Sequence, residues 1–173
     1  MPEPTADKSL IGAAGVHFVS AELSLRGLIA LPTVRNTAGV DVIAVDKAGT
    51  WVANIQVKSS RNKAMFWIVG KHHASWRGPN NYYVFVRYVK AAGRFEAFLE
   101  TSERVSAEVS AWMAKKKQRG LKEWAPCWFL PDDIDRLRQQ WDNFGPPVKD
   151  VLPQGRNKAR PFASRSTRGD GAA

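Results

Sequence analysis

Apolar residues recur at helical spacing near the start of this chain and at the alternating spacing of strands further on. Runs rich in valine, isoleucine and alanine at 28–33, 40–46 and 51–58 predict three strands. Residues 11–26 precede them and are predicted to form a helix that Gly27 ends. The apolar stripe of this helix consists of Ile11, Ala14, Phe18, Ala21 and Leu25. The chain therefore begins helix, strand, strand, strand.

The second half of the chain continues this alternation and favours an α/β fold. Thr101 or Ser102 is suited to cap a helix whose last turn carries basic residues, which favour a helix's carboxyl end. Residues 59–81 are the least regular part and are expected to form loops around a short apolar segment at 64–69. The other predicted elements are strands at 82–89, 95–99 and 127–130, a helix ending near residue 117, and a final helix beginning at Pro131.

The composition indicates how the chain is divided. With 173 residues, of which 44% are hydrophobic and 24% charged, it fits one globular domain, expected over residues 11–145. Residues 1–10 are expected to be a flexible N-terminus, and residues 146–173, rich in proline, glycine, serine and arginine, a disordered basic tail. No apolar run approaches the roughly 18 residues of a membrane span, and the start lacks the features of a signal peptide. A cytoplasmic protein with no membrane partner is expected.

A hairpin centred on Ala48 and Gly49 brings three polar residues together. A tight turn fixes the pairing of the strands on either side, and counting back along both strands places Asp41 opposite Gln56. Because side chains alternate faces with period two, Lys58 joins these two residues on one surface. An acid, an amide and a lysine therefore meet where apolar residues would be expected.

Positive charge surrounds this cluster in the sequence. The formal net charge is +10, and no acidic residue occurs between Asp46 and Glu96, an interval that contains nine lysines and arginines and several aromatic residues. Such a stretch favours a phosphate backbone as partner, and the alternative is a solvated basic face beside core aromatics. The residues expected to contact nucleic acid are Ser59, Arg61, Lys63, Lys71, His72 and Arg77.

The cluster has the groups that hydrolysis of a phosphodiester needs. Magnesium prefers oxygen ligands and commonly uses one or two protein carboxylates, with Mn²⁺ as a substitute. Asp41, the Gln56 amide and the Val57 carbonyl are candidate ligands, and Glu22 is a fourth if its helix packs over this face. Lys58 would orient or deprotonate the attacking water, or stabilise negative charge in the transition state. The structural alternatives are a surface pair of Glu22 with Arg26 and an exposed pair of Lys58 with Asp41.

The strings GVD and IQVK, with a glutamate on a preceding helix, resemble the PD-(D/E)XK nuclease superfamily. The resemblance implies a restriction-endonuclease-like core, which is a mixed α+β sheet with flanking helices. It assigns Asp41, Gln56, Lys58 and Glu22 to the catalytic positions. Val40 replaces the usual proline, and Gln56 replaces the second acid and removes one charge from the site. A similar QVK string occurs in the superfamily's group I intron-encoded homing endonuclease, and Holliday-junction-resolvase-like members have a similar layout.

The leading hypothesis is a magnesium-dependent DNA endonuclease that acts on duplex or branched DNA. RNA stays an alternative substrate, and a homodimer or higher homo-oligomer is expected because cutting both strands needs two active sites. One rival is a nucleic-acid-binding module that keeps the nuclease fold without turnover, which the glutamine at position 56 motivates. A third hypothesis is a basic subunit of a phage or mobile-element complex.

Overall fold

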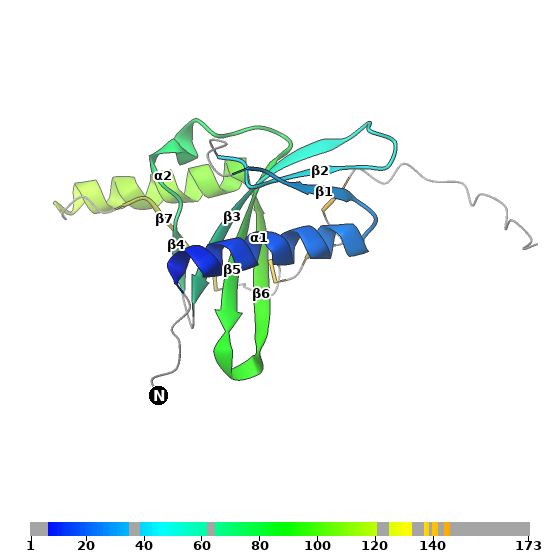
Figure 1. The fold of residues 1–173 in the computed structure, drawn as a ribbon. Coiled ribbons are helices and arrows are strands. Elements are labelled where there is room, and N and C mark those ends of the chain that lie inside the picture. Colours follow the sequence, from blue (N-terminus) through cyan, green and yellow to red (C-terminus); the bar gives the residue numbers. More distant parts are fainter. Residues whose placement is uncertain are drawn as a thin grey trace, which may run out of the picture.

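The protein folds around a five-stranded mixed sheet with the strand order β1-β2-β3-β5-β6. The computed structural model describes residues 7–34, 39–61, 65–120, 125–132, 137–138, 140–141 and 144–145. Helix α1 lies across the sheet, and helix α2 lies toward its other side (Figure 1). This arrangement confirms the expected α+β class with a mixed sheet and flanking helices.

Helix α1 (Lys8–Leu25) begins three residues before the expected start. The side chain of Asp7 accepts a hydrogen bond from the backbone N–H of Ser9 and so caps the helix. Positions 8–10, expected to be flexible, are therefore helical. Gly27, with a φ of 84°, follows the helix end as predicted.

The buried face of α1 differs from the predicted apolar stripe. Its buried residues are Gly15, Val19 and Leu23, whereas 81% of Leu25, which belongs to the predicted stripe, is exposed. The helix is apolar around much of its circumference, so periodicity alone did not fix which side faces the sheet. Close packing of Gly15 against β3 selects the face.

The first three strands have the predicted register. β1 (Ile29–Pro32), β2 (Val42–Val45) and β3 (Val52–Arg61) are antiparallel neighbours, and Val42 lies opposite Ile55. Continuing this register by one residue places Asp41 opposite Gln56, as the turn at residues 48–49 predicted. The carboxylate of Asp46 holds that turn, because it accepts hydrogen bonds from the backbone N–H groups of Thr50 and Trp51 at 2.7 and 2.9 Å.

The remaining main-sheet strands lie beside β3. β5 (Asn81–Val89) runs parallel to β3, and β6 (Arg94–Thr101) runs antiparallel to β5 after the short helix η2 (Lys90–Ala92). Thr101 caps α2 (Ser102–Gln118) through the backbone N–H of Arg104, in agreement with the predicted cap. The predicted strands at 82–89 and 95–99 are therefore confirmed with small changes of boundary.

Residues 59–81 are more regular than predicted. β3 extends through Arg61, so positions 59–61 form a strand and not a loop. β4 (Phe66–Ile68) pairs with β7 (Cys127–Phe129) in a second, two-stranded sheet, and the helix η1 (Lys71–Ala74) connects β4 toward β5. The pairing joins segments about 60 residues apart, which local patterns do not specify. Most of the predicted final helix, Lys63 and the tail at 146–173 lie outside the described residues.

Two apolar cores form the layers on either side of the main sheet. Val19 and Leu23 of α1 pack on one face with Ala44, Ile55 and Val84. On the other face the core includes residues of β4, β5, β6, α2 and β7: Trp67, Phe85, Phe98, Val105 and Trp128. Successive residues of β3 therefore point alternately to the α1 side and to the α2 side.

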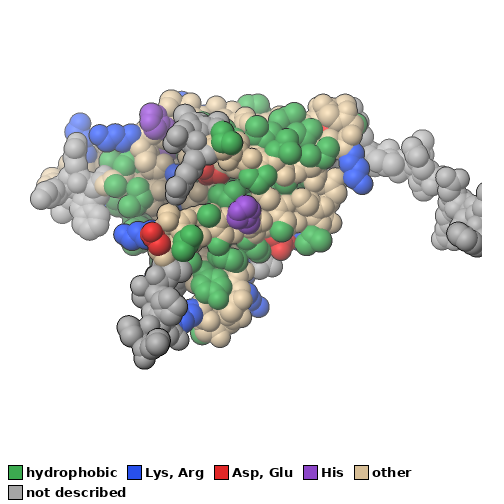
Figure 2. Space-filling view, viewed as in Figure 1, with side chains coloured by type: hydrophobic (Ala, Val, Ile, Leu, Met, Phe, Trp, Pro, Cys, Tyr) green, Lys and Arg blue, Asp and Glu red, His purple; other side chains and the backbone are tan. Residues whose placement is uncertain are grey.

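The distribution of hydrophobic and basic side chains on the surface bears on the expected nucleic-acid and membrane partners. Viewed with α1 in front, hydrophobic side chains cover much of the centre of the molecule, and the lysines and arginines lie mainly toward its edges (Figure 2). No helix among the described residues is long and apolar enough to cross a membrane.

Candidate functional site

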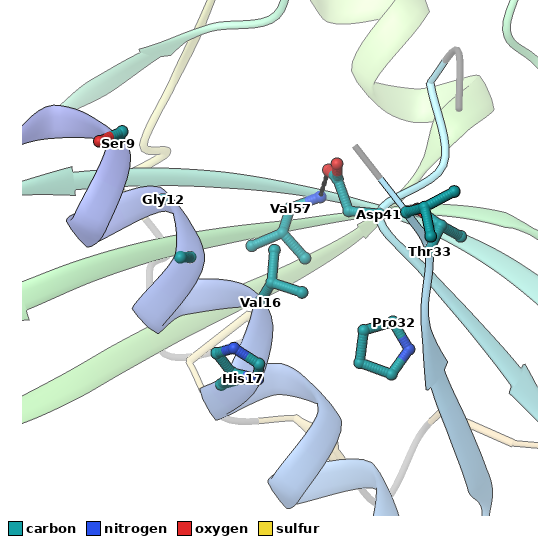
Figure 3. A pocket seen from close by; sticks show the side chains of 10 residues that line it. Ser9, Gly12, Val16, His17, Pro32, Thr33, Asp41 and Val57 are labelled. Carbon is teal, nitrogen blue, oxygen red and sulfur yellow. Dashed lines mark hydrogen bonds between the residues drawn. The ribbon is translucent and has the colours of Figure 1, made fainter. Parts of the chain in front are cut away.

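The candidate site lies where β3 continues past the end of β2. The ladder between the two strands ends with Val42 opposite Ile55, and Asp41 then bends along the edge of β3. Its backbone N–H donates to the Ile55 carbonyl at 2.8 Å, and its carboxylate Oδ2 accepts the backbone N–H of Val57 at 2.7 Å (Figure 3). The side chain of Asp41 therefore replaces the missing strand partner at this point of the edge.

This arrangement places two oxygens, Asp41 Oδ1 and the Val57 carbonyl oxygen, at one edge of the sheet. Within the described residues, Oδ1 of Asp41 has no hydrogen-bond partner, since the carboxylate bonds Val57 through Oδ2 alone. The N–H and C=O of one strand residue point to the same edge, so the Val57 carbonyl faces the side on which Asp41 lies. A carboxylate oxygen and a carbonyl oxygen are donors suited to a hard divalent cation.

A hollow of about 490 Å³ opens beside Asp41. Figure 3 shows α1 on one side of it, the end of β1 on another and Val57 at its back. His17 of α1 reaches this hollow, and Thr33 donates a hydrogen bond from Oγ1 to the Val40 carbonyl at 2.6 Å, which holds the segment before Asp41. Sequence reasoning did not place Thr33 at the site, because nothing local links it to Asp41.

The close approach of α1 to β3 shapes this hollow. A Cβ atom built on Gly15 would overlap Oγ of Ser59 and lie 3.2 Å from its Cβ, so any larger side chain would force the helix and strand apart. Oγ of Ser59 is buried there and has no hydrogen-bond partner among the described residues. Ser59, expected to contact nucleic acid, therefore packs against the helix with its hydroxyl.

Lys58 is partly buried and points to the α2 side of the sheet, with Gln56. These two residues lie beside Phe85 and Tyr83, whose side chains belong to the core on that side. Burial lowers the pKa of Lys58, and the charge of Asp41 opposes this by raising it. Lys58 has no ion pair within 4.0 Å among the described residues, so the alternative of a direct pair with Asp41 is not formed.

Glu22 lies apart from this group. Its carboxylate accepts a hydrogen bond from Arg26 at 2.7 Å, which is the surface pair considered as the structural alternative. It is five residues beyond His17, the last α1 residue that lines the hollow, and so about 7.5 Å further along the helix axis. The described residues contain no group of three histidine, cysteine, aspartate or glutamate side chains that could hold a metal ion.

The residues expected to contact nucleic acid are divided between two elements. Arg61 is at the end of β3, and its Nη2 is buried without a hydrogen-bond partner in the described part of the chain. Lys71 and His72 are exposed on η1, and Arg77 is exposed just after it. The neighbouring His73 is buried instead, and its Nδ1 lies 2.9 Å from the Gly70 carbonyl.

Trp76 brings the segment that carries Arg77 toward the candidate site. The ring of Trp76 packs so closely on Gly39 that a Cβ there would lie 3.2 Å from the ring. Gly39 is two residues before Asp41, and its φ of 75° favours glycine as well. The exposed Arg77 is therefore attached to a segment that contacts the Asp41 loop, although no sequence signal paired them.

Comparisons with known proteins leave the family open. No family model matches the chain, and no curated protein sequence matches it. Among solved structures, the bacterial homing endonuclease I-Ssp6803I is similar over 80% of this chain and 91% of its own, with 13% sequence identity and a TM-score of 0.47. Likeness at this level assigns neither family nor activity, and the PD-(D/E)XK pattern stays a resemblance of residues.

Proposed function

We propose that the protein is a divalent-metal-dependent endonuclease that hydrolyses DNA phosphodiester bonds at the free edge of β3. The observation that carries this proposal is the hydrogen bond from the Val57 N–H to Asp41. This hydrogen bond orients a carboxylate at the edge of a hollow, beside Lys58, whose pKa is lowered by burial. A carboxylate and an amine that releases its proton more readily than a free lysine are the groups that positioning and proton transfer at a phosphate require.

The donor atoms fit one magnesium ion. Asp41 Oδ1 and the Val57 carbonyl are the candidate ligands at the edge, with the Gln56 amide oxygen as a third. Magnesium is commonly held by one or two carboxylates together with water and substrate phosphate, so a single carboxylate suffices. When bound, such an ion supplies neutralisation of phosphate charge and a more acidic water. With Gln56 neutral and Glu22 paired to Arg26, we expect weak binding of one ion, with Mn²⁺ as a substitute.

The protein's own groups divide the remaining work. The hydrogen bond from the Val57 N–H fixes the Asp41 carboxylate, which then orients the metal ion or water that binds at Oδ1. Lys58 Nζ holds a proton less tightly than a free lysine does, because burial disfavours its charged form. In its charged form Nζ offsets phosphate charge, and in its neutral form it accepts a proton from the attacking water.

The charge distribution supports DNA as the substrate. The exposed side chains of Lys71, His72 and Arg77 are available for phosphate contacts, and the interval from Asp46 to Glu96 contains no other acid to oppose them. Phosphate contacts position a nucleic acid without reading its sequence. Duplex and branched DNA are both proposed, and RNA is the alternative.

The test is nicking of plasmid and branched DNA with Mg²⁺ or Mn²⁺. Asp41→Asn keeps an oxygen that accepts the Val57 N–H but removes the charge, and it should reduce the rate by on the order of 100-fold or more. Lys58→Met should also reduce it. Asp46→Asn is the matched control, because Asp46 also accepts backbone hydrogen bonds but lies at the other end of the hairpin. Equal cleavage by wild type and Asp41→Asn would overturn the proposal.

A second candidate function is DNA binding without turnover. The observation that favours it is the location of Glu22, which leaves Asp41 as the one carboxylate that reaches the hollow within the described residues. This function predicts salt-sensitive DNA binding that survives Asp41→Asn, together with no metal-dependent cleavage by the wild type. The nicking assay and a salt titration of binding distinguish the two.

A further inference from the structure

A second hollow lies beside Lys58, on the β4 side of β3. Its volume is about 400 Å³, within the range of small-molecule sites. It is lined by residues 57–60 of β3 and by all of β4 (Phe66–Ile68). Val57 lines this hollow and also the one beside Asp41, so the two hollows adjoin at the same stretch of β3.

The β4 wall presents an aromatic ring and an aliphatic side chain. Trp67 points into the core, where its Nε1 donates to the Val86 carbonyl at 3.2 Å and fixes the strand. Its neighbours Phe66 and Ile68 therefore point outward and are 48% and 58% exposed. An exposed ring on a fixed strand is a ready stacking surface.

The β3 wall is polar and positively charged. Oγ of Ser60 is buried and has no hydrogen-bond partner among the described residues, and Lys58 has no ion pair there. A buried hydroxyl without a partner is unfavourable, so a ligand that offers it a donor or acceptor gains binding energy. The ligand that fits these walls is flat and apolar on its faces, polar at its edges and attached to negative charge.

We propose that this hollow holds one unstacked nucleobase of a DNA strand whose phosphate lies at Asp41. The base would stack on Phe66, its polar edge would meet Ser60, and its phosphate would face Lys58. This inference rests on the proposed function and narrows its substrate to DNA in which a nucleotide is unpaired or easily unstacked, as at bulges and branches. Extruding such a nucleotide costs less than extruding one from a paired duplex.

The test compares three labelled duplexes that differ at one position: fully paired, carrying one bulged nucleotide, and carrying an abasic bulge. Binding is measured by fluorescence anisotropy without divalent metal, so no cleavage occurs. The bulged nucleotide should bind roughly 5- to 100-fold more tightly than the abasic bulge, because only the former offers a base to stack. Phe66→Ala should abolish this preference, and Phe66→Leu, which keeps apolar bulk, should weaken it.

Ile29→Ala is the matched control. Ile29 of β1 is 48% exposed, as Phe66 is, and does not line the hollow, so the preference should persist in this variant. Equal affinity for the bulged nucleotide and the abasic bulge overturns the base-binding proposal, even if metal-dependent nicking at Asp41 is present. A preference that depends on Phe66, together with no nicking of any substrate, supports base binding and overturns the cleavage proposal alone.

Discussion

The contact of Gly15 with β3 gives the sharpest expected effect on stability. In Gly15→Ala the added Cβ would overlap Ser59 Oγ and lie 3.2 Å from Ser59 Cβ and 3.7 Å from Val57 Cγ1. Inserting a methyl group into such a packed contact costs about 1–3 kcal/mol. Alanine is favoured over glycine in a helix by about 0.8–1 kcal/mol, which offsets part of this cost.

Gly12 on the same helix provides a matched comparison. A Cβ at Gly12 meets no atom within 4 Å, so Gly12→Ala should keep most of the helix-propensity gain and raise the free energy of unfolding by about 0.5–1 kcal/mol. Gly15→Ala should therefore be less stable than Gly12→Ala by about 1–3 kcal/mol, which is the cost of the clash alone.

Urea unfolding followed by tryptophan fluorescence measures both variants, provided that the denaturant slopes agree with that of wild type. In a Ser59→Ala background, which removes the nearest clashing atom, the cost of Gly15→Ala should shrink by a coupling energy on the order of 1 kcal/mol. If Gly15→Ala and Gly12→Ala are equally stable, α1 does not pack on β3 as described, and the shape of the hollow beside Asp41 is wrong as well.

Four further expectations concern ionisable groups. Burial lowers the pKa of Lys58 and Asp41 raises it, so Asp41→Asn should lower that pKa further in an NMR titration of the lysine side chains. Because its folded pKa lies below the unfolded value, Lys58→Met should stabilise the fold at neutral pH, a gain that fades as the pH approaches about 10.4. Hydrogen bonds from backbone and side chain lower the pKa of Asp46. Wild type should therefore be more stable than Asp46→Ala above about pH 3.9, and this difference should vanish as the pH falls through the lower folded pKa. A difference that does not change with pH in acid would contradict this. Glu96 is buried and its Oε2 lies 2.7 Å from Nη2 of Arg87, so Glu96→Gln should cost about 3 kcal/mol in urea unfolding, and a loss below about 1 kcal/mol would show that the pair behaves as an exposed one.

The local parts of the structure could be predicted from the sequence. The turn at Ala48 and Gly49 fixed which residues of β2 and β3 face each other, and so the approach of Asp41 to Gln56. The cap at Thr101 was equally visible. In both cases the determining contacts lie within a few residues of each other, where turn geometry and backbone hydrogen bonds leave few alternatives.

The placement of Glu22 shows where local patterns are insufficient. The sequence made Glu22 a candidate ligand if its helix packed over the site, but the buried residues of that helix are Gly15, Val19 and Leu23. The rotation of α1 is set by packing of Gly15 on Ser59 of β3, more than 40 residues away, whereas Glu22 pairs with Arg26 on its own helix. The pairing of β4 with β7 is a second such case, because neither strand carries a local signal for its partner.

By itself, then, the sequence determined the order of the first helix and three strands and the hairpin register that places Asp41 opposite Gln56. Only the tertiary structure decided that β2 begins one residue after Asp41 and that the Asp41 carboxylate turns to the Val57 N–H. It also decided that Lys58 is partly buried beside β4, which lowers its pKa. The physical reason is that register depends on contacts between near neighbours, whereas burial, helix rotation and strand-edge exposure depend on which distant segments pack together.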